Sequence, residues 1–481
     1  MELIIILVIA LLAAGLSLIP VGKKLAPAIT NIGTLAIFLL SLRVAFVAIK
    51  SAEVVALKNW VACDSLGAII LLLVAFVGLT ASIFSWGYVE KRVAVNNPYK
   101  IRRYYALYNL FLFSMLAIPM LSNIALVWIA VGLTTVSSVF LVAFDNTSES
   151  LEAAWKYIIL TSMGAAFALL GVLILYWGLN TVGHGPFTWA ELVKLSPGIP
   201  GDILKTAFIF ILIGLGTKAG LVPFHTWLPD AYSQAPAPVC ALLSIAESTT
   251  VLYVILRMQP ILQGAAGNYA GVWFIVFGLI SVGVAAFLII QVKDLKRLFA
   301  FSTIEHMGII LVAAGIGGPA AWYAATLQIV SHALAKSFAF FATGSSLMAT
   351  GNQDIASVRG LIRTSPVSAV SLAVAGLAIA GAPPFAVFLS EFSILKAGLT
   401  SGQYIASGLL AFFIVIAFWG VMYHINRMVF GRPEPGSKGI PLRASNITAL
   451  LLAGAPIVLL GLFLPGPFNK LVHLASILLG R

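Results

Sequence analysis

Apolar residues run in long, nearly unbroken stretches along the chain, and short polar segments separate them. Because the hydrocarbon core of a bilayer is about 30 Å thick, a helix needs roughly 20 apolar residues to cross it. Fourteen stretches have this character, which predicts an all-α polytopic membrane protein. They are residues 3–21, 28–49, 65–86, 106–122, 123–144, 155–178, 203–222, 237–257, 270–292, 299–315, 320–342, 367–398 (broken), 403–426 and 445–464.

Composition supports this prediction and excludes a soluble globular domain. Hydrophobic residues make up 61% of the chain and charged residues 9%, and the mean hydropathy is +1.05. Those values lie far outside the range of soluble domains. The first apolar run has neither a basic leader nor a cleavage-site pattern, so we expect a retained helix and not a signal peptide.

The net charge of +12 is concentrated in the loops, which argues against a nucleic-acid partner. If loops are numbered by the helix they follow, seventeen basic residues fall in odd loops: Lys23, Lys24, Lys91, Arg92, Lys100, Arg102, Arg103, Lys156, Lys293, Lys296, Arg297, Arg359, Arg363, Arg427, Arg432, Lys438 and Arg443. Even loops hold five: Lys50, Lys58, Lys194, Lys205 and Arg257. The positive-inside rule then predicts a multi-pass cell-membrane protein with both termini on the outer side.

A few ionisable residues lie inside the predicted spans. A charge at the bilayer centre costs at least about 2.5–3.5 kcal/mol, so each is a candidate for function. Arg43 lies near a helix end and can extend its charge to the interface, and Lys396 is open to either interpretation. Lys218 and Lys336 lie deep in long runs. The clear acidic cases are Glu247 and Glu391.

Prolines interrupt two of the spans, the seventh at Pro223 and the twelfth at Pro383 and Pro384. Broken membrane helices persist only where protein or a wet cavity satisfies the freed backbone groups. Spans 4–8 and 9–13 form two five-helix units in which the fourth helix is broken, and an odd helix count inverts one unit relative to the other. Paired interrupted helices are typical of a transporter-like site near the midplane.

This order predicts four regions. They are the N-terminal helices (1–105), the first five-helix unit (106–258), the second (259–430), and a C-terminal loop, helix and tail (431–481). The stretch FGRPEPGSKGIP from Phe430 is expected to be a polar, flexible cytoplasmic connection.

The string TKAGLVPFHTWLPDAYSQAPAPVCALLS from Thr217 resembles the signature of the antiporter-like subunits shared by respiratory complex I, Mrp-type sodium/proton antiporters and group 4 membrane-bound hydrogenases. Similar matches are DLKRLFAFSTIEHMG from Asp294, SHALAKSFAFFATG from Ser331 and PPFAVFLSEFSIL from Pro383. EAAWKYIIL from Glu152, together with STIEHMG, most resembles the subunit of the hydrogenase branch and related formate-oxidising or sulfur-reducing complexes.

The resemblance implies a fourteen-helix fold with broken seventh and twelfth helices, in which Lys218 is the central proton carrier. Burial can tune a lysine toward proton exchange, so this role is chemically reasonable. His332 and Lys336 lie four residues apart on one helix face and could relay a proton. Glu391 resembles the terminal ionisable group of the family.

Three other ionisable residues keep more than one interpretation. His225 follows the first break and could either relay protons or bond freed backbone. Glu305 and His306 could serve conduction, a helix end or a contact with a neighbouring subunit.

Two departures from the family pattern bear on mechanism. The family usually has a glutamate on its fifth helix that pairs with the seventh-helix lysine, and here Gly132 occupies that position. On the eighth helix Thr249 replaces the usual lysine or asparagine, and Glu247 lies two residues earlier. Two residues turn an α-helix by about 200°, so Glu247 cannot point in the same direction as Thr249. We nevertheless hypothesise that Glu247 replaces the missing carboxylate near Lys218.

These observations predict an H+ or Na+ translocating subunit of a membrane-bound redox complex, with Lys218, His332, Lys336, Glu391, Glu247 and His225 as candidates. A stand-alone Na+/H+ antiporter subunit is the first alternative, and a non-pumping scaffold is the second. Cys63 and Cys240 are too few for an iron–sulfur or zinc site, and the chain has no GxxxxGK[ST] phosphate loop. Nickel–iron or iron–sulfur centres are therefore expected only in partner subunits.

Overall fold

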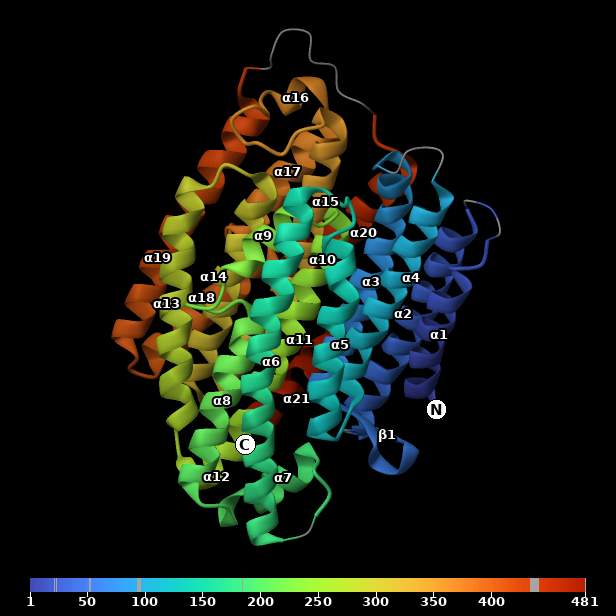
Figure 1. Ribbon diagram of the computed structural model, residues 1–481. Coiled ribbons are helices and arrows are strands. Elements are labelled where there is room, and N and C mark those ends of the chain that lie inside the picture. The colour runs from blue at the N-terminus through green and yellow to red at the C-terminus, as the bar shows by residue number, and fades with distance from the viewer. Residues whose placement is uncertain are drawn as a thin grey trace.

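The computed structural model describes residues 1–20, 22, 24–51, 53–92, 97–183, 185–432 and 441–480. Within these residues the protein is a bundle of long helices that run roughly parallel or antiparallel (Figure 1). The polar connection from Phe430 lies outside the described residues from 433 to 440. Nine helices of the described part are long and apolar enough to cross a membrane. The all-α polytopic prediction is therefore confirmed, and the count of fourteen spans stays a prediction.

The N-terminal region contains three long helices and one short hairpin. It comprises α1 (Glu2–Leu16), α2 (Leu25–Ser51), β1 (Glu53–Ala56), β2 (Val61–Asp64) and α3 (Ser65–Arg92). The strands are antiparallel, with Glu53 opposite Asp64. The hairpin lies at the end of the bundle that also carries the N terminus and α7 (Figure 1).

The predicted first five-helix unit contains several short elements between its long helices. They are α4 (Pro98–Ala117), α5 (Ile124–Val142), α6 (Ser148–Val182), α7 (Trp189–Leu195), α8 (Gly201–Ala219), α9 (Trp227–Gln234), α10 (Ala237–Leu243), the π-helix η4 (Ser244–Thr249), α11 (Thr250–Leu256) and α12 (Met258–Ala266). Residues 237–266 are almost wholly buried and lie at the centre of the bundle.

The second unit and the C-terminal region follow. They comprise α13 (Tyr269–Gln291), α14 (Leu295–Ile316), α15 (Gly318–Thr350), α16 (Leu361–Thr364), α17 (Pro366–Ile379), α18 (Ala386–Thr400), α19 (Tyr404–Phe430), α20 (Ala444–Leu462) and α21 (Gly466–Leu479). We expected only a tail after α20, yet α21 packs against α3 and α15. Its 14 residues, which include Asn469, Lys470 and His473, are too few and too polar to indicate a membrane span.

Both predicted breaks are present, but each begins before its proline. The helix α8 ends at Ala219 because Gly220 adopts a left-handed φ of 79°, and α17 ends at Ile379, two residues before Gly381 with a φ of 70°. Each stop is closed by a backbone bond across the turn, from Leu221 N to Gly216 O (2.8 Å) and from Ala382 N to Leu377 O (3.0 Å). Glycine-based stops of this kind satisfy the last carbonyls of a helix.

Large apolar side chains cover the outer helices. Examples are Trp155 on α6, Ile405 on α19 and Leu459 on α20, which are 66%, 81% and 62% exposed. A soluble monomer rarely exposes so much contiguous apolar surface. The lateral surface of the bundle is thus suited to a lipid bilayer or to neighbouring membrane subunits.

Candidate ion-translocation site

Lys218 and Glu247 form a buried ion pair within the predicted first five-helix unit. Lys218 lies in the last turn of α8, and Glu247 lies in η4. The Lys218 Nζ atom is 2.9 Å from Glu247 Oε2, and the two side chains are 1% and 0% exposed. Because water is excluded from both side chains, their charge attraction is stronger than it would be at the protein surface.

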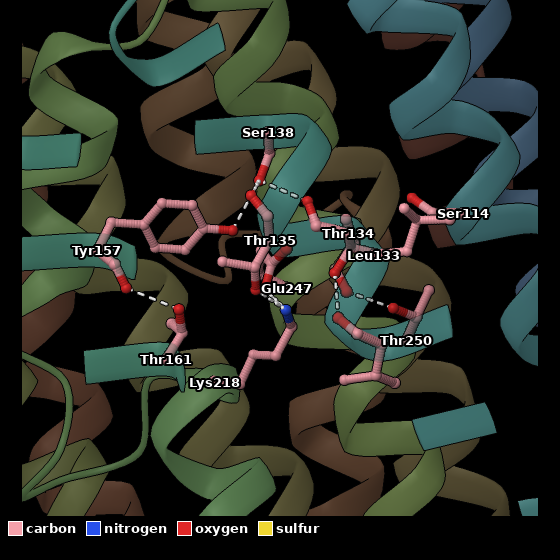
Figure 2. Close-up of polar contacts among 12 residues, drawn as sticks. Ser114, Leu133, Thr134, Thr135, Ser138, Tyr157, Thr161, Lys218, Glu247 and Thr250 are labelled. Atoms are coloured by element: carbon pink, nitrogen blue, oxygen red, sulfur yellow. Dashed lines mark hydrogen bonds and ion pairs between the residues drawn. The ribbon is translucent and has the colours of Figure 1, made fainter. Parts of the chain in front are cut away.

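The helix α5 supplies hydroxyl groups beside this pair. The Lys218 ammonium donates a hydrogen bond to Thr135 Oγ1. One turn further along α5, the hydroxyl oxygens of Ser138 and Tyr157 are 2.7 Å apart. Figure 2 shows these groups gathered on one side of the Lys218–Glu247 pair. A row of rotatable hydroxyls can both donate and accept, so it can pass a proton.

A π-helical turn positions Glu247. The segment Ser244–Thr249 widens the backbone between α10 and α11, and Thr249 Oγ1 donates to Ser244 O at 3.4 Å, five residues back. Such turns are rare and frequently lie at functional sites. The sequence argument from 200° of α-helical rotation does not apply inside this turn, because the α-helical pitch is interrupted there.

Gly132 does not contribute a charge, as the sequence predicted. A Cβ atom built on Gly132 would meet no heavy atom within 4 Å, so the position is open and unfilled. Thr135, which contacts Lys218, lies three residues later on the same face of α5. The carboxylate beside Lys218 comes instead from Glu247.

Lys336 is another buried lysine, and its hydrogen bonds within the described structure go to neutral oxygens. It lies on α15 with no exposed surface, and its Nζ donates to Phe299 O at 2.8 Å and to Ser302 Oγ. Both acceptors belong to α14. No carboxylate oxygen of the described residues lies within 4.0 Å of this ammonium.

Three more buried ionisable groups surround Lys336. Glu305 is 4% exposed and lies on α14, one turn from Ser302. The rings of His306 and His332 are 5.2 Å apart. His306 Nε2 is 3.1 Å from Ile379 O, at the end of α17, whereas neither ring nitrogen of His332 has a hydrogen-bond partner among the described residues. Glu305 and His306 thus lie inside the bundle, in midhelix.

Glu391 lies against the second break. It is on α18 and 6% exposed, and a Cβ added to Gly381 would come within 2.2 Å of its Oε2. His225 lies beyond the first break, half-buried, and its Nδ1 has no partner in the described structure. The remaining intramembrane lysine, Lys396, is exposed on α18.

The helix α15 links the two clusters. It carries Lys336 and His332 and packs against both η4 and α14, so it contacts the elements that carry Glu247 and Glu305. The sequence missed Thr135, Ser138, Tyr157 and Ser302 because hydroxyl residues are common in membrane helices. Their spacing of three or four residues from a candidate position was the available signal.

Comparison with known proteins places this arrangement in a family. Residues 103–417 match the family model described as "NADH:quinone oxidoreductase/Mrp antiporter, TM". The chain belongs to this family. The match covers both lysines, both breaks and every candidate site residue named above.

Individual relatives agree with the assignment. The chain is 38% identical over 383 residues to a hydrogenase-4 component F homolog of Methylacidiphilum infernorum, covering 78% of this chain and 80% of that protein. It is 28% identical over 419 residues to NADH-quinone oxidoreductase subunit N of Desulforudis audaxviator, covering 83% and 81%. These matches confirm the resemblance drawn from the sequence motifs.

Among solved structures, a chain of the archaeal membrane-bound sulfane sulfur reductase matches with a TM-score of 0.89 and 26% identity. The match covers 100% of this chain and 98% of that one. The protein is accordingly an antiporter-like membrane subunit, and its homologues belong to multi-subunit membrane complexes.

Proposed function

We propose that this family member translocates protons, or Na+, as the antiporter-like subunit of a membrane-bound redox complex. Ions move through Lys218, His332, Lys336 and Glu391, with Glu247 as the partner of Lys218 and His225 at the first break. The observation that carries the proposal is the Lys218–Glu247 pair, 2.9 Å apart and buried in an otherwise apolar bundle.

The cost of burying this pair favours transport over a passive scaffold. Replacing a buried ion pair by apolar residues is often neutral or stabilising, so a scaffold gains nothing from keeping it. A transporter does gain, because a proton can move between ammonium and carboxylate at this distance, and any charge that arrives nearby shifts that balance. This linkage lets electron transfer in a partner subunit drive a proton here.

The scaffold alternative arose because Gly132 replaces the family's glutamate. Glu247 supplies a carboxylate to Lys218 from η4, so the absence of a glutamate at Gly132 is a weaker argument for a scaffold. The names of the relatives, a hydrogenase-4 component and a subunit of a respiratory sulfur reductase complex, support a redox partner over a stand-alone Na+/H+ antiporter. The proposed partners include peripheral subunits with nickel–iron or iron–sulfur centres.

The proposed location is the cell membrane, with both termini on the outer side. The charge distribution supports it, because the described odd loops that carry basic residues, such as the one between α13 and α14 and the one around α16, lie at the end of the bundle opposite the N terminus (Figure 1). Tags placed at either terminus should be accessible to a protease added outside intact cells.

Purification of the native complex in mild detergent, followed by mass spectrometry, tests the redox assignment. Hydrogenase-like and iron–sulfur subunits should copurify. Recovery of small membrane subunits alone would overturn the redox assignment in favour of a stand-alone antiporter. Transport in sodium-free and sodium-containing buffers would then distinguish H+ from Na+.

A further inference from the structure

A cavity of about 470 Å³ lies at the end of the bundle that carries the β1–β2 hairpin and α7. We call it the vestibule. Its lining includes Glu53, Asp64, Ser122, Trp189, Arg257 and Leu478. A cavity of this size with charged and polar groups in part of its wall has room for several water molecules. None of the candidate transport residues lines it, and its wall combines residues of the β1–β2 hairpin, of the predicted first unit and of α21.

Charged and polar groups line part of the vestibule. Arg257 donates to both carboxylate oxygens of Asp64 at 2.6 Å, and Glu53 lies opposite Asp64 across the hairpin. Partial burial, and then the Asp64 charge, raise the pKa of the Glu53 carboxyl from its usual value. Ser122 Oγ and Trp189 Nε1 have no hydrogen-bond partner among the described residues. Water is the simplest partner for both groups.

A second, much smaller cavity of about 20 Å³ adjoins the vestibule at Trp189, which lines both. We call it the apolar gap. Aliphatic side chains of α5, α6, α8 and α11 surround it, among them Val131, Leu215 and Val254. The indole N–H of Trp128, which also lines the gap, already donates to Ala165 O at 2.9 Å. Small cavities lined by apolar groups stay dry.

The gap leads toward the ion pair. Val131 lies four residues before Thr135 on α5, and Leu215 three residues before Lys218 on α8, so each is about 5–6 Å along its helix from the pair. Val254 follows Glu247 by seven residues, about two turns, on the helix that continues to Arg257. The vestibule, the apolar gap and the ion pair therefore lie one after another along the same helices.

The pair has a different neighbourhood on its other side. On the C-terminal side of Val131, the buried face of α5 carries hydroxyl residues in place of aliphatic ones. They are Thr134, Thr135, Ser137 and Ser138. Figure 2 shows hydroxyl groups of this face beside Lys218. The pair thus adjoins polar groups in one direction and a dry gap in the other.

We propose that the vestibule and the apolar gap form a gated half-channel to Lys218–Glu247 from the hairpin end of the bundle, with Val131, Leu215 and Val254 as the gate. This inference rests on the proposed function. A proton needs a hydrogen-bonded path, and a dry segment interrupts it; hydrophobic constrictions gate in this way by wetting and dewetting. The structure represents the closed state, in which the dry gap prevents protons from flowing passively across the membrane through the ion pair.

The test uses the complete complex in liposomes, without redox substrates, and measures proton influx driven by a potassium diffusion potential. The double variant Val131→Thr/Val254→Thr adds hydroxyls at nearly constant volume, and Leu215→Ser provides a second way to wet the gap. Both should leak protons several-fold faster than the native complex. Val136→Thr is the matched control, since Val136 is on α5 but 53% exposed on the lateral surface.

The leak should disappear when Lys218→Met/Glu247→Gln is added, because the gap opens onto the ion pair and this double variant is expected to assemble. Gap variants that assemble but do not leak would overturn the gate, and so would a leak that persists without Lys218. Failure of the proposed function has another signature: Lys218→Met alone would then leave redox-driven transport intact.

Discussion

Lys218 and Lys336 are both buried lysines on central helices, but different neighbours balance their charges. Lys218 has a carboxylate 2.9 Å away, whereas Lys336 is held by a backbone carbonyl and a serine hydroxyl of α14. Removing one member of an ion pair leaves the other uncompensated, while removing Lys336 leaves only neutral oxygens within 4.0 Å. Substitutions of the two lysines should therefore differ more in their effect on the assembly of the complex than in their effect on proton transport.

Lys218→Met should have the largest effect. It leaves Glu247 buried without its partner, and such a loss costs about 3–5 kcal/mol of folding free energy. We expect no redox-driven proton transport, measured as acidification of vesicles, and a low yield of assembled complex on native gels. The double variant Lys218→Met/Glu247→Gln should regain the yield and remain inactive. An equally low yield of the double variant would contradict the ion-pair account.

Lys336→Met should reduce transport by about tenfold or more, equivalent to at least ~1.4 kcal/mol in the barrier. Its assembly should stay close to that of the native complex because no carboxylate oxygen of the described residues is paired with it. Lys396→Met serves as the control for a lysine that is exposed on α18, and its transport should be unchanged. A collapse of assembly in Lys336→Met would mean that the two lysines do not differ as proposed.

Moving the carboxylate should restore part of the activity lost in Glu247→Gln. The space beside Gly132 is open, and Gly132 is one turn from Thr135, so Gly132→Glu can bring a carboxylate to the same ammonium. We expect transport by Gly132→Glu/Glu247→Gln to lie between that of Glu247→Gln and the native complex. Gly132→Gln in the same background matches the size without the charge and should give no rescue; equal rescue by both would contradict an electrostatic cause.

Thr135→Val should have the smallest effect. A hydrogen bond to a charged group contributes about 1.5–3 kcal/mol, and Lys218 keeps Glu247 when this bond is lost. We expect slower transport with unchanged assembly, measured by initial rates in vesicles. Thr134→Val is the control, because the Thr134 hydroxyl donates to Val131 O at 2.8 Å and not to Lys218. Identical effects of the two variants would remove Thr135 from the site.

Hydropathy and proline positions were enough to predict the helical bundle and both breaks. They did not reveal that Gly220 and Gly381 end the helices before the prolines, because a left-handed glycine has no distinctive neighbours in the sequence. The hairpin β1–β2 was missed because four-residue strands are too short for a clear alternation. The helix α21 was missed because its 14 residues are too few to span a bilayer and include Asn469, Lys470 and His473.

The site was predictable as a set of charges but not as a geometry. Glu247 was singled out because Gly132 lacks a carboxylate, yet rotation along a regular α-helix could not place it beside Lys218. The π-helical turn of η4, which changes that rotation, has no simple sequence signal. The neutral contacts of Lys336 could not be predicted either, since they depend on how α14 and α15 pack.

The most direct test of the account is the number of protons translocated per electron in the complex that carries Glu247→Gln. Electron transfer and vesicle acidification are recorded together with the redox substrates of the partner subunits, so slow turnover cannot be mistaken for lost coupling. The account predicts that electron transfer continues while the proton-to-electron ratio falls. An unchanged ratio would contradict the claim that the Lys218–Glu247 pair carries the transported proton.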